Sequence, residues 1–174
     1  NMFSNSKYFR TMLTNSQHNN NNSNNNSIII LSKQNLYTIP QIKLKTQTQI
    51  SILYLNLNHI SKIPSHFITQ FPSLTELYLQ NNKLTSIVNP LPQTLTKLDL
   101  SNNNITSSLS AISTLTNLKW LNISYNRICS LKDINTLPKL NELYVNNNQL
   151  SHIKECYILK DLPSLQILNI NDNE

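Results

Sequence analysis

LTELYLQNNKL, the stretch Leu74–Leu84, decides the fold of this chain. It follows the spacing L-x-x-L-x-L-x-x-N-x-L, with the fixed positions at Leu74, Leu77, Leu79, Asn82 and Leu84. Within L-x-L, side chains alternate, so both leucines point to one side and the residue between them points to the other. The stretch therefore predicts a short strand with a buried face, which ends in a turn at the asparagine.

The same spacing recurs along the chain. Further copies begin at Ile50, Leu95, Leu118, Leu140 and Leu165, and a degenerate copy at Ile29–Ile39 has Gln34 in place of the asparagine. From Gln34 onward, the steps between successive markers are 24, 24, 21, 23, 22 and 25 residues. Such a narrow range of steps indicates one structural unit that is repeated.

In this spacing and period, the chain resembles the leucine-rich repeat family. The resemblance implies an α/β fold: a right-handed solenoid, or horseshoe, with short parallel strands on the concave face and 3₁₀ or extended segments on the convex face. Each repeat becomes stable only when it is stacked on its neighbours. Three-residue spacings such as Ile112, Leu115 and Leu118, repeated at Ile134, Leu137 and Leu140, predict 3₁₀ helices. They resemble the 22-residue subclass that includes the nuclear regulatory subunit of protein phosphatase 1.

The asparagine markers are predicted to form a structural ladder, with one rung per repeat. The rungs are Asn58, Asn82, Asn103, Asn126, Asn148 and Asn173. A carboxamide both donates and accepts hydrogen bonds, so it can satisfy the backbone groups left unpaired at a turn. Because the chain has no glycine, we also expect asparagine to supply the left-handed turn residues. The absence of glycine argues against phosphate loops and dinucleotide fingerprints.

The chain divides into two parts by composition. Residues 1–27 are rich in Asn and Ser and predict a disordered leader. Its apolar residues between Phe3 and Leu13 are compatible with a partner-binding helix, with a segment folded over the first repeat, or with a plain spacer. Residues 28–174 predict a leucine-rich repeat domain of about six to seven repeats. We expect this domain to be truncated at its C-terminus, because no capping motif follows Asn173.

The charge is unevenly distributed. The formal net charge is +6, yet residues 1–46 alone carry +5 without any acid, so the repeats are nearly neutral. No basic stripe with interleaved aromatics is present, which predicts that nucleic acid is not a partner. There is neither a signal region nor an apolar run long enough to span a bilayer, so no membrane association is expected. With only two cysteines, a reducing compartment is favoured: cytoplasmic, with a nuclear location also possible.

Candidate partner-binding residues are those that point outward from the strands. Because parallel strands stack about 4.8 Å apart, these residues form columns on the concave face. The candidates are Tyr54, Glu76, Tyr78, Lys97, Asp99, Trp120, Asn122, Glu142 and Tyr144. Exposed aromatic side chains are typical anchors of protein interfaces, although tyrosine also favours strands by propensity. Glu76 and Glu142 beside Lys97 indicate either a charge pattern that sets register or a solvated face.

No catalytic, cofactor-binding or metal-binding residues are predicted. The histidines His59, His66 and His152 fall at unrelated positions of the repeats, and no H-x-x-x-H spacing occurs. Glu76 and Asp99 are expected on adjacent strands, but no pocket is predicted around them. The sequence therefore predicts a monomeric, non-enzymatic module that binds a protein partner of unknown identity. The alternative is a regulatory segment of a larger signalling enzyme, such as a kinase, GTPase or phosphatase complex.

Overall fold

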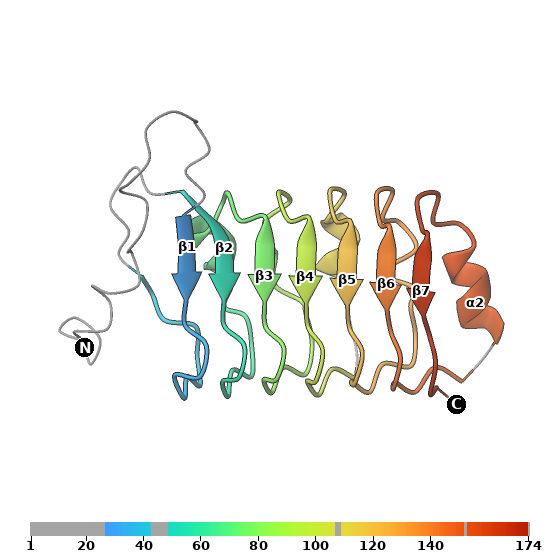
Figure 1. The fold of residues 1–174 in the computed structure, drawn as a ribbon, viewed down its shortest axis with the longest axis horizontal. Coiled ribbons are helices and arrows are strands. Elements are labelled where there is room, and N and C mark those ends of the chain that lie inside the picture. The colour runs from blue at the N-terminus through green and yellow to red at the C-terminus, as the bar shows by residue number, and fades with distance from the viewer. Residues whose placement is uncertain (1–26, 43–48, 107–108, 152, 174) are drawn as a thin grey trace.

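The computed structural model describes residues 27–42, 49–106, 109–151 and 153–173 (Figure 1). The predicted leader at 1–27 lies outside these residues, except for Ser27, whose backbone begins the first strand.

The described residues form one parallel sheet of seven strands. These are β1 (Ser27–Ile30), β2 (Ile50–Tyr54), β3 (Glu76–Tyr78), β4 (Lys97–Asp99), β5 (Trp120–Asn122), β6 (Glu142–Tyr144) and β7 (Ile167–Asn169). Each strand pairs with the next one in the sequence, so the sheet order is the chain order, as Figure 1 shows. Parallel neighbours one repeat apart require the chain to cross behind the sheet once per repeat. The predicted α/β repeat solenoid is confirmed.

The strand register aligns equivalent residues of successive repeats. The first inward position carries Leu53, Leu77, Leu98, Leu121, Leu143 and Leu168, each paired with the next. The second inward position carries Leu55, Leu79, Leu100, Ile123 and Val145, all 0% exposed. The L-x-L alternation therefore faces the core in every repeat, as predicted, because a one-residue slip would turn these side chains toward solvent.

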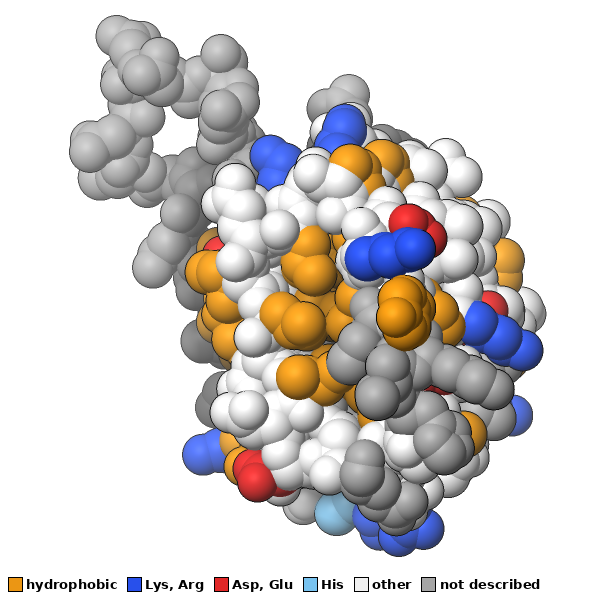
Figure 2. All heavy atoms as spheres, turned by 90° about the vertical axis from the view of Figure 1, so that its right-hand side faces the viewer, with side chains coloured by type: hydrophobic (Ala, Val, Ile, Leu, Met, Phe, Trp, Pro, Cys, Tyr) orange, Lys and Arg blue, Asp and Glu red, His pale blue; other side chains and the backbone are white. Residues whose placement is uncertain are grey.

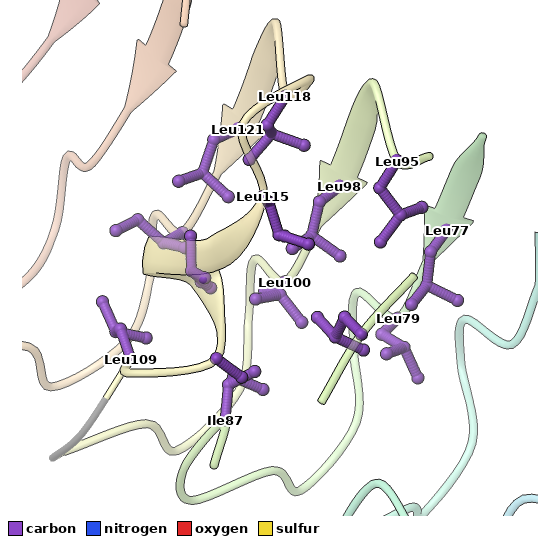
Figure 3. Packing of buried hydrophobic residues seen from close by; sticks show 14 of the residues in the cluster. Leu77, Leu79, Ile87, Leu95, Leu98, Leu100, Leu109, Leu115, Leu118 and Leu121 are labelled. Carbon is purple, nitrogen blue, oxygen red and sulfur yellow. The ribbon is translucent and has the colours of Figure 1, made fainter. Parts of the chain in front are cut away.

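The wall opposite the sheet contains short helices. These are α1 (Phe67–Gln70) and η1 (Ile112–Thr114), whereas α2 (Ile153–Leu159) lies beyond β7 at the right-hand end of the solenoid in Figure 1. Phe67 and Phe71 are buried with their ring centroids 5.1 Å apart. Figure 3 shows that Leu115, at the end of η1, and Leu98 of β4 both point into the space between the sheet and this wall. The core is therefore shared between neighbouring repeats.

The 3₁₀ prediction is confirmed at Ile112 and is wrong at Ile134. There the backbone N–H groups of Ile134, Leu137 and Leu140 each donate to the carbonyl oxygen three residues earlier, at 2.9, 3.2 and 3.4 Å. These bonds form separate turns rather than a helix. Pro138 has no N–H to donate, so the turn closed by Leu137 cannot be followed by a second turn at the next residue.

Each ladder asparagine forms hydrogen bonds that connect its own repeat to the preceding one. Asn103 is representative: its Oδ1 accepts from the N–H of Leu84 at 2.9 Å. Its Nδ2 donates to the carbonyl oxygens of Leu79 and Leu100 at 3.1 and 3.0 Å. Asn58, Asn82, Asn126 and Asn148 are buried in the same way, and Asn173 is half-buried. Backbone groups at the turn thus form hydrogen bonds with a side chain of the adjacent repeat.

The residue before each asparagine marker has a left-handed backbone conformation. Asparagine fills this position at Asn81, Asn102 and Asn147, with φ of 59°, 52° and 56°. The expectation that asparagine makes these turns is wrong elsewhere. Leu57 and Tyr125 adopt φ of 58° and 54°, although their Cβ atoms disfavour this region. Stacking of the repeats imposes the same turn whichever residue occupies it.

The stack has an open apolar end at β7. Leu168 occupies the inward position that Leu143 occupies one repeat earlier, yet it is 42% exposed whereas Leu143 is 0% exposed. Figure 2 views this end of the solenoid and shows hydrophobic side chains gathered at its centre, with polar atoms around them. Among the described residues, no strand pairs with the outer edge of β7.

Candidate functional site

The outward side chains of the strands form a surface that we call the strand face, which the repeat pattern predicts to be concave. The register places its residues in two columns. The first column carries Ile28, Ile52, Glu76, Lys97, Trp120, Glu142 and Ile167. The second carries Ile30, Tyr54, Tyr78, Asp99, Asn122, Tyr144 and Asn169. The structure thus brings all nine candidate partner-binding residues onto this one surface.

The aromatic residues of the strand face form two pairs. Tyr54 and Tyr78 are stacked with their ring centroids 4.6 Å apart and their planes 7° apart. Trp120 and Tyr144 lie 5.5 Å apart at 44°. All four side chains are only half-exposed, because each ring covers part of its neighbour. Aromatic contacts of this geometry hold the rings in place.

Lys97 joins the two pairs into one continuous row. Its Nζ lies 5.4 Å from the ring centroid of Tyr78 and 4.7 Å from that of Trp120. Both distances are within the range of a cation–π interaction, which is worth roughly 0.5–1 kcal/mol at exposed sites. We call the five residues Tyr54, Tyr78, Lys97, Trp120 and Tyr144 the aromatic row.

Glu76 and Glu142 bind tyrosines of their own strands. Both lie in an E-L-Y sequence, in β3 and in β6. The hydroxyl of Tyr78 donates to Glu76 Oε2 at 2.7 Å, and that of Tyr144 donates to Glu142 Oε2 at 2.9 Å. Within the described residues neither glutamate forms an ion pair with Lys97. Each of these two carboxylates thus contacts the tyrosine of its own strand.

These contacts contribute to a raised pKa of both phenols. Burial, followed by the hydrogen bond to Glu76, raises the pKa of Tyr78 well above its ordinary value. For Tyr144 the hydrogen bond to Glu142 is the main cause of its raised pKa. A carboxylate that accepts from a phenol favours its neutral form, which is the form that donates the hydrogen bond to Glu76 and to Glu142.

Asp99 and Asn122 support the ends of their strands. Asp99 Oδ1 accepts from the backbone N–H of Ser101 at 3.0 Å and from its hydroxyl at 2.7 Å. Asn122 Oδ1 accepts from the backbone N–H and the hydroxyl of Ser124 in the same way. Burial raises the pKa of Asp99 despite these bonds and the nearby Lys97. Sequence reasoning missed this role, although the shared D/N-x-S spacing signals it.

Other groups of chemical interest lie apart from the strand face. A surface pocket of about 400 Å³ is lined by Ser61, Lys62, Ile63, Thr85, Ser86, Val88 and Asn89. It holds no carboxylate or histidine. The ring of His59 lies 5.1 Å from that of Tyr37, and Cys129 is an exposed free thiol. Over the described ranges, no three His, Cys, Asp or Glu side chains are grouped so that they could hold a metal ion.

No helix in the described part of the chain has both the length and the apolar character needed to cross a membrane.

A parallel sheet with one strand per repeat, a shared leucine core and an asparagine ladder defines a repeat solenoid. Residues 48–93 match the pattern described as Leucine Rich repeats (2 copies), and residues 94–115 and 117–140 match the Leucine Rich Repeat pattern. These matches cover more than half of the chain. The chain belongs to the leucine-rich repeat family. The sequence patterns and the structure thus identify the same repeats.

Solved structures share the fold. An internalin (inlF) from Listeria monocytogenes str. 4b F2365 has 30% identity and a TM-score of 0.62, over 72% of this chain and 36% of that one. YopM from Yersinia enterocolitica WA-314 has 23% identity and a TM-score of 0.63, over 84% and 29%. A TLR13–ssRNA13 complex has 30% identity and a TM-score of 0.60, over 72% and 18%. The chain thus spans about a third or less of these proteins.

No curated protein sequence matches the chain. The leucine-rich repeat fold is a general protein interaction module, and the same solenoid serves many partners. What this chain binds therefore has to be inferred from the outward-facing side chains of its strands, and not from its fold.

Proposed function

We propose that this chain is a protein interaction module that binds its partner through the aromatic row on the strand face. The observation that carries the proposal is the row itself: one stacked and one tilted pair of aromatic rings, with Lys97 between Tyr78 and Trp120. Tyrosine and tryptophan dominate the energetically important positions of protein interfaces. Here they lie on a sheet that is backed by fully buried leucines.

Preorganisation supports this proposal. The hydroxyls of Tyr78 and Tyr144 are already bonded to Glu76 and Glu142. Ordering a side chain on binding costs about 0.5–1.5 kcal/mol for each flexible group. Rings that are fixed before the partner arrives avoid much of this cost, so the row is suited to act as a rigid anchor.

The charge of the strand face favours protein over nucleic acid. Its two columns carry the carboxylates of Glu76, Asp99 and Glu142 and the single ammonium of Lys97, a net charge of −2. Binding to nucleic acid depends on many cationic contacts to phosphates. A surface with more carboxylates than ammonium groups repels a phosphate backbone.

The test compares aromatic substitutions on and off the strand face. Trp120→Ala and Tyr144→Ala are expected to reduce capture of the partner from cell extract by about tenfold or more, because anchor residues contribute roughly 2 kcal/mol or more each. Tyr157→Ala is the matched control, since Tyr157 is an exposed tyrosine on α2 and not on the strand face. Thermal unfolding of all three variants checks that the fold is retained.

Photocrosslinking identifies the surface directly. A photoreactive phenylalanine in place of Tyr144 is expected to crosslink to the captured partner, whereas the same group in place of Tyr157 is not. If neither alanine variant on the strand face weakens capture, or if only position 157 crosslinks, binding takes place on another surface and the proposal is wrong.

A further inference from the structure

The aromatic row has the chemistry of a cation-binding surface. Aromatic faces carry negative electrostatic potential, and the strand face adds the three carboxylates of Glu76, Asp99 and Glu142. The chain as a whole has a formal net charge of +6. The strand face therefore opposes the overall charge, so the excess of carboxylates is a local property of this surface.

A cation already occupies part of this surface. Lys97 reaches over the rings of Tyr78 and Trp120 at 5.4 and 4.7 Å. Its Nζ forms no ion pair with a carboxylate among the described residues. The ammonium group is thus held by aromatic faces, and the chain's own side chain shows which kind of group this surface accepts.

The half of the row beyond Lys97 has the same chemistry. Trp120 lies beside Glu142 in the register of β5 and β6, and its ring contacts that of Tyr144. Glu142 uses Oε2 for the tyrosine hydroxyl, while its Oε1 has no hydrogen bond within the described residues. Two rings and a carboxylate oxygen thus converge. Lys97 lies over the ring of Trp120, but within the described residues no Lys or Arg lies over that of Tyr144.

We propose that the partner presents a basic segment to the strand face, with an arginine side chain lying on Trp120 and Tyr144 and donating to Glu142. This deepens the proposed function and rests on it. A guanidinium group stacks on aromatic rings and forms forked hydrogen bonds with carboxylates, so it matches both features better than an ammonium group. Lys97 limits the affinity, because it repels a second cation nearby and competes for the face of Trp120.

Trp120 supplies the readout. It is the only tryptophan of the chain, so intrinsic fluorescence excited in the tryptophan band reports on the proposed site alone. The full chain is titrated with three synthetic ten-residue peptides, in which alanine alternates with arginine, glutamate or glutamine. The arginine peptide is expected to change the fluorescence with saturation. This response is expected to weaken as salt is added, because exposed charges are screened.

Three charge variants test the contacts. Glu142→Gln keeps an acceptor for Tyr144 but removes the charge, and is expected to weaken binding of the arginine peptide about fivefold or more. Lys97→Gln is expected to strengthen it about threefold to tenfold. Asp161→Asn removes one exposed charge outside the strand face and is expected to leave the affinity unchanged.

Several outcomes overturn the proposal of a basic partner. The first is that the glutamate peptide binds as well as the arginine peptide. The second is that the Lys97→Gln variant binds the arginine peptide more weakly than the unaltered chain does. The third is that the arginine peptide gives no saturable response up to about 1 mM, a concentration that corresponds to a binding free energy of only about 4 kcal/mol. An Asp161→Asn effect equal to that of Glu142→Gln also overturns it, because attraction would then be non-specific. If these results occur while Trp120→Ala still reduces capture from extract about tenfold or more, the strand face binds a partner of different chemistry, and the proposed function stands.

Discussion

At the residue scale, the turn before each ladder asparagine imposes one backbone conformation on very different side chains. Leu57 and Tyr125 have the same positive φ as Asn81. Leu57 is 42% exposed and Tyr125 is 53% exposed, so packing offsets only part of the strain. A left-handed conformation costs an ordinary L-residue roughly 1–2 kcal/mol, and asparagine lowers this cost by local hydrogen bonding. The strained turns persist because stacking of the repeats fixes them.

Leu57→Asn is therefore expected to stabilise the protein by about 0.5–1 kcal/mol, since it relieves strain in the folded state. Urea unfolding measures the change. The converse substitution Asn81→Leu, at the equivalent position one repeat later, is expected to destabilise by a similar amount. A lower stability of Leu57→Asn would show that contacts of the leucine side chain outweigh the strain of its backbone.

At the element scale, the ladder asparagines hold the turns of neighbouring repeats together. Asn103 accepts from Leu84 in the preceding repeat and donates to Leu100 in its own. Its side chain is buried, so water cannot replace these partners. The side chain of the adjacent Asn104 is exposed, and only its backbone N–H bonds to the preceding repeat.

Asn103→Ala is expected to cost roughly 1–3 kcal/mol, because buried backbone groups lose their partners. Asn104→Ala removes the same side chain from the neighbouring position and is expected to change stability by less than about 0.5 kcal/mol. Chemical denaturation of the two variants separates the contribution of the ladder from that of asparagine in general. Equal losses would mean that the ladder hydrogen bonds are not what stabilises the turn.

At the scale of the whole molecule, stability depends on where a residue lies in the stack. Each repeat contacts only its neighbours. A central leucine is therefore enclosed from both sides, and a terminal one from a single side. Leu98 and Leu168 occupy the same inward position, but they are 0% and 42% exposed. The difference arises from the stacking alone, since both follow the same L-x-L pattern.

Leu98→Ala is expected to destabilise by about 2–5 kcal/mol, the range for a fully buried leucine. Leu168→Ala at the open end is expected to cost about 1 kcal/mol, because much of its surface already faces solvent. Differential scanning calorimetry of the two variants compares them directly. A loss at Leu168 as large as that at Leu98 would show that the open end is covered in solution.

The sequence by itself determined the repeat, the strands and the inward leucines. These features depend on spacing within one repeat, and alternation along a strand is a local rule. The same rule assigned Tyr78, Trp120 and Glu142 to one surface. The chain's own residues therefore define which side chains are available to a partner.

Only the tertiary structure decided how those side chains pair. Glu76 is close in the pattern to both Lys97 and Tyr78, yet it accepts from the tyrosine, and Lys97 lies on the rings of Tyr78 and Trp120. Likewise, the sequence did not show that Leu57 is held in a left-handed turn. The physical reason is that residues from different repeats compete for the same contacts, and strand register and ring packing decide which contacts form. The spacing of residues within one repeat carries no information about either.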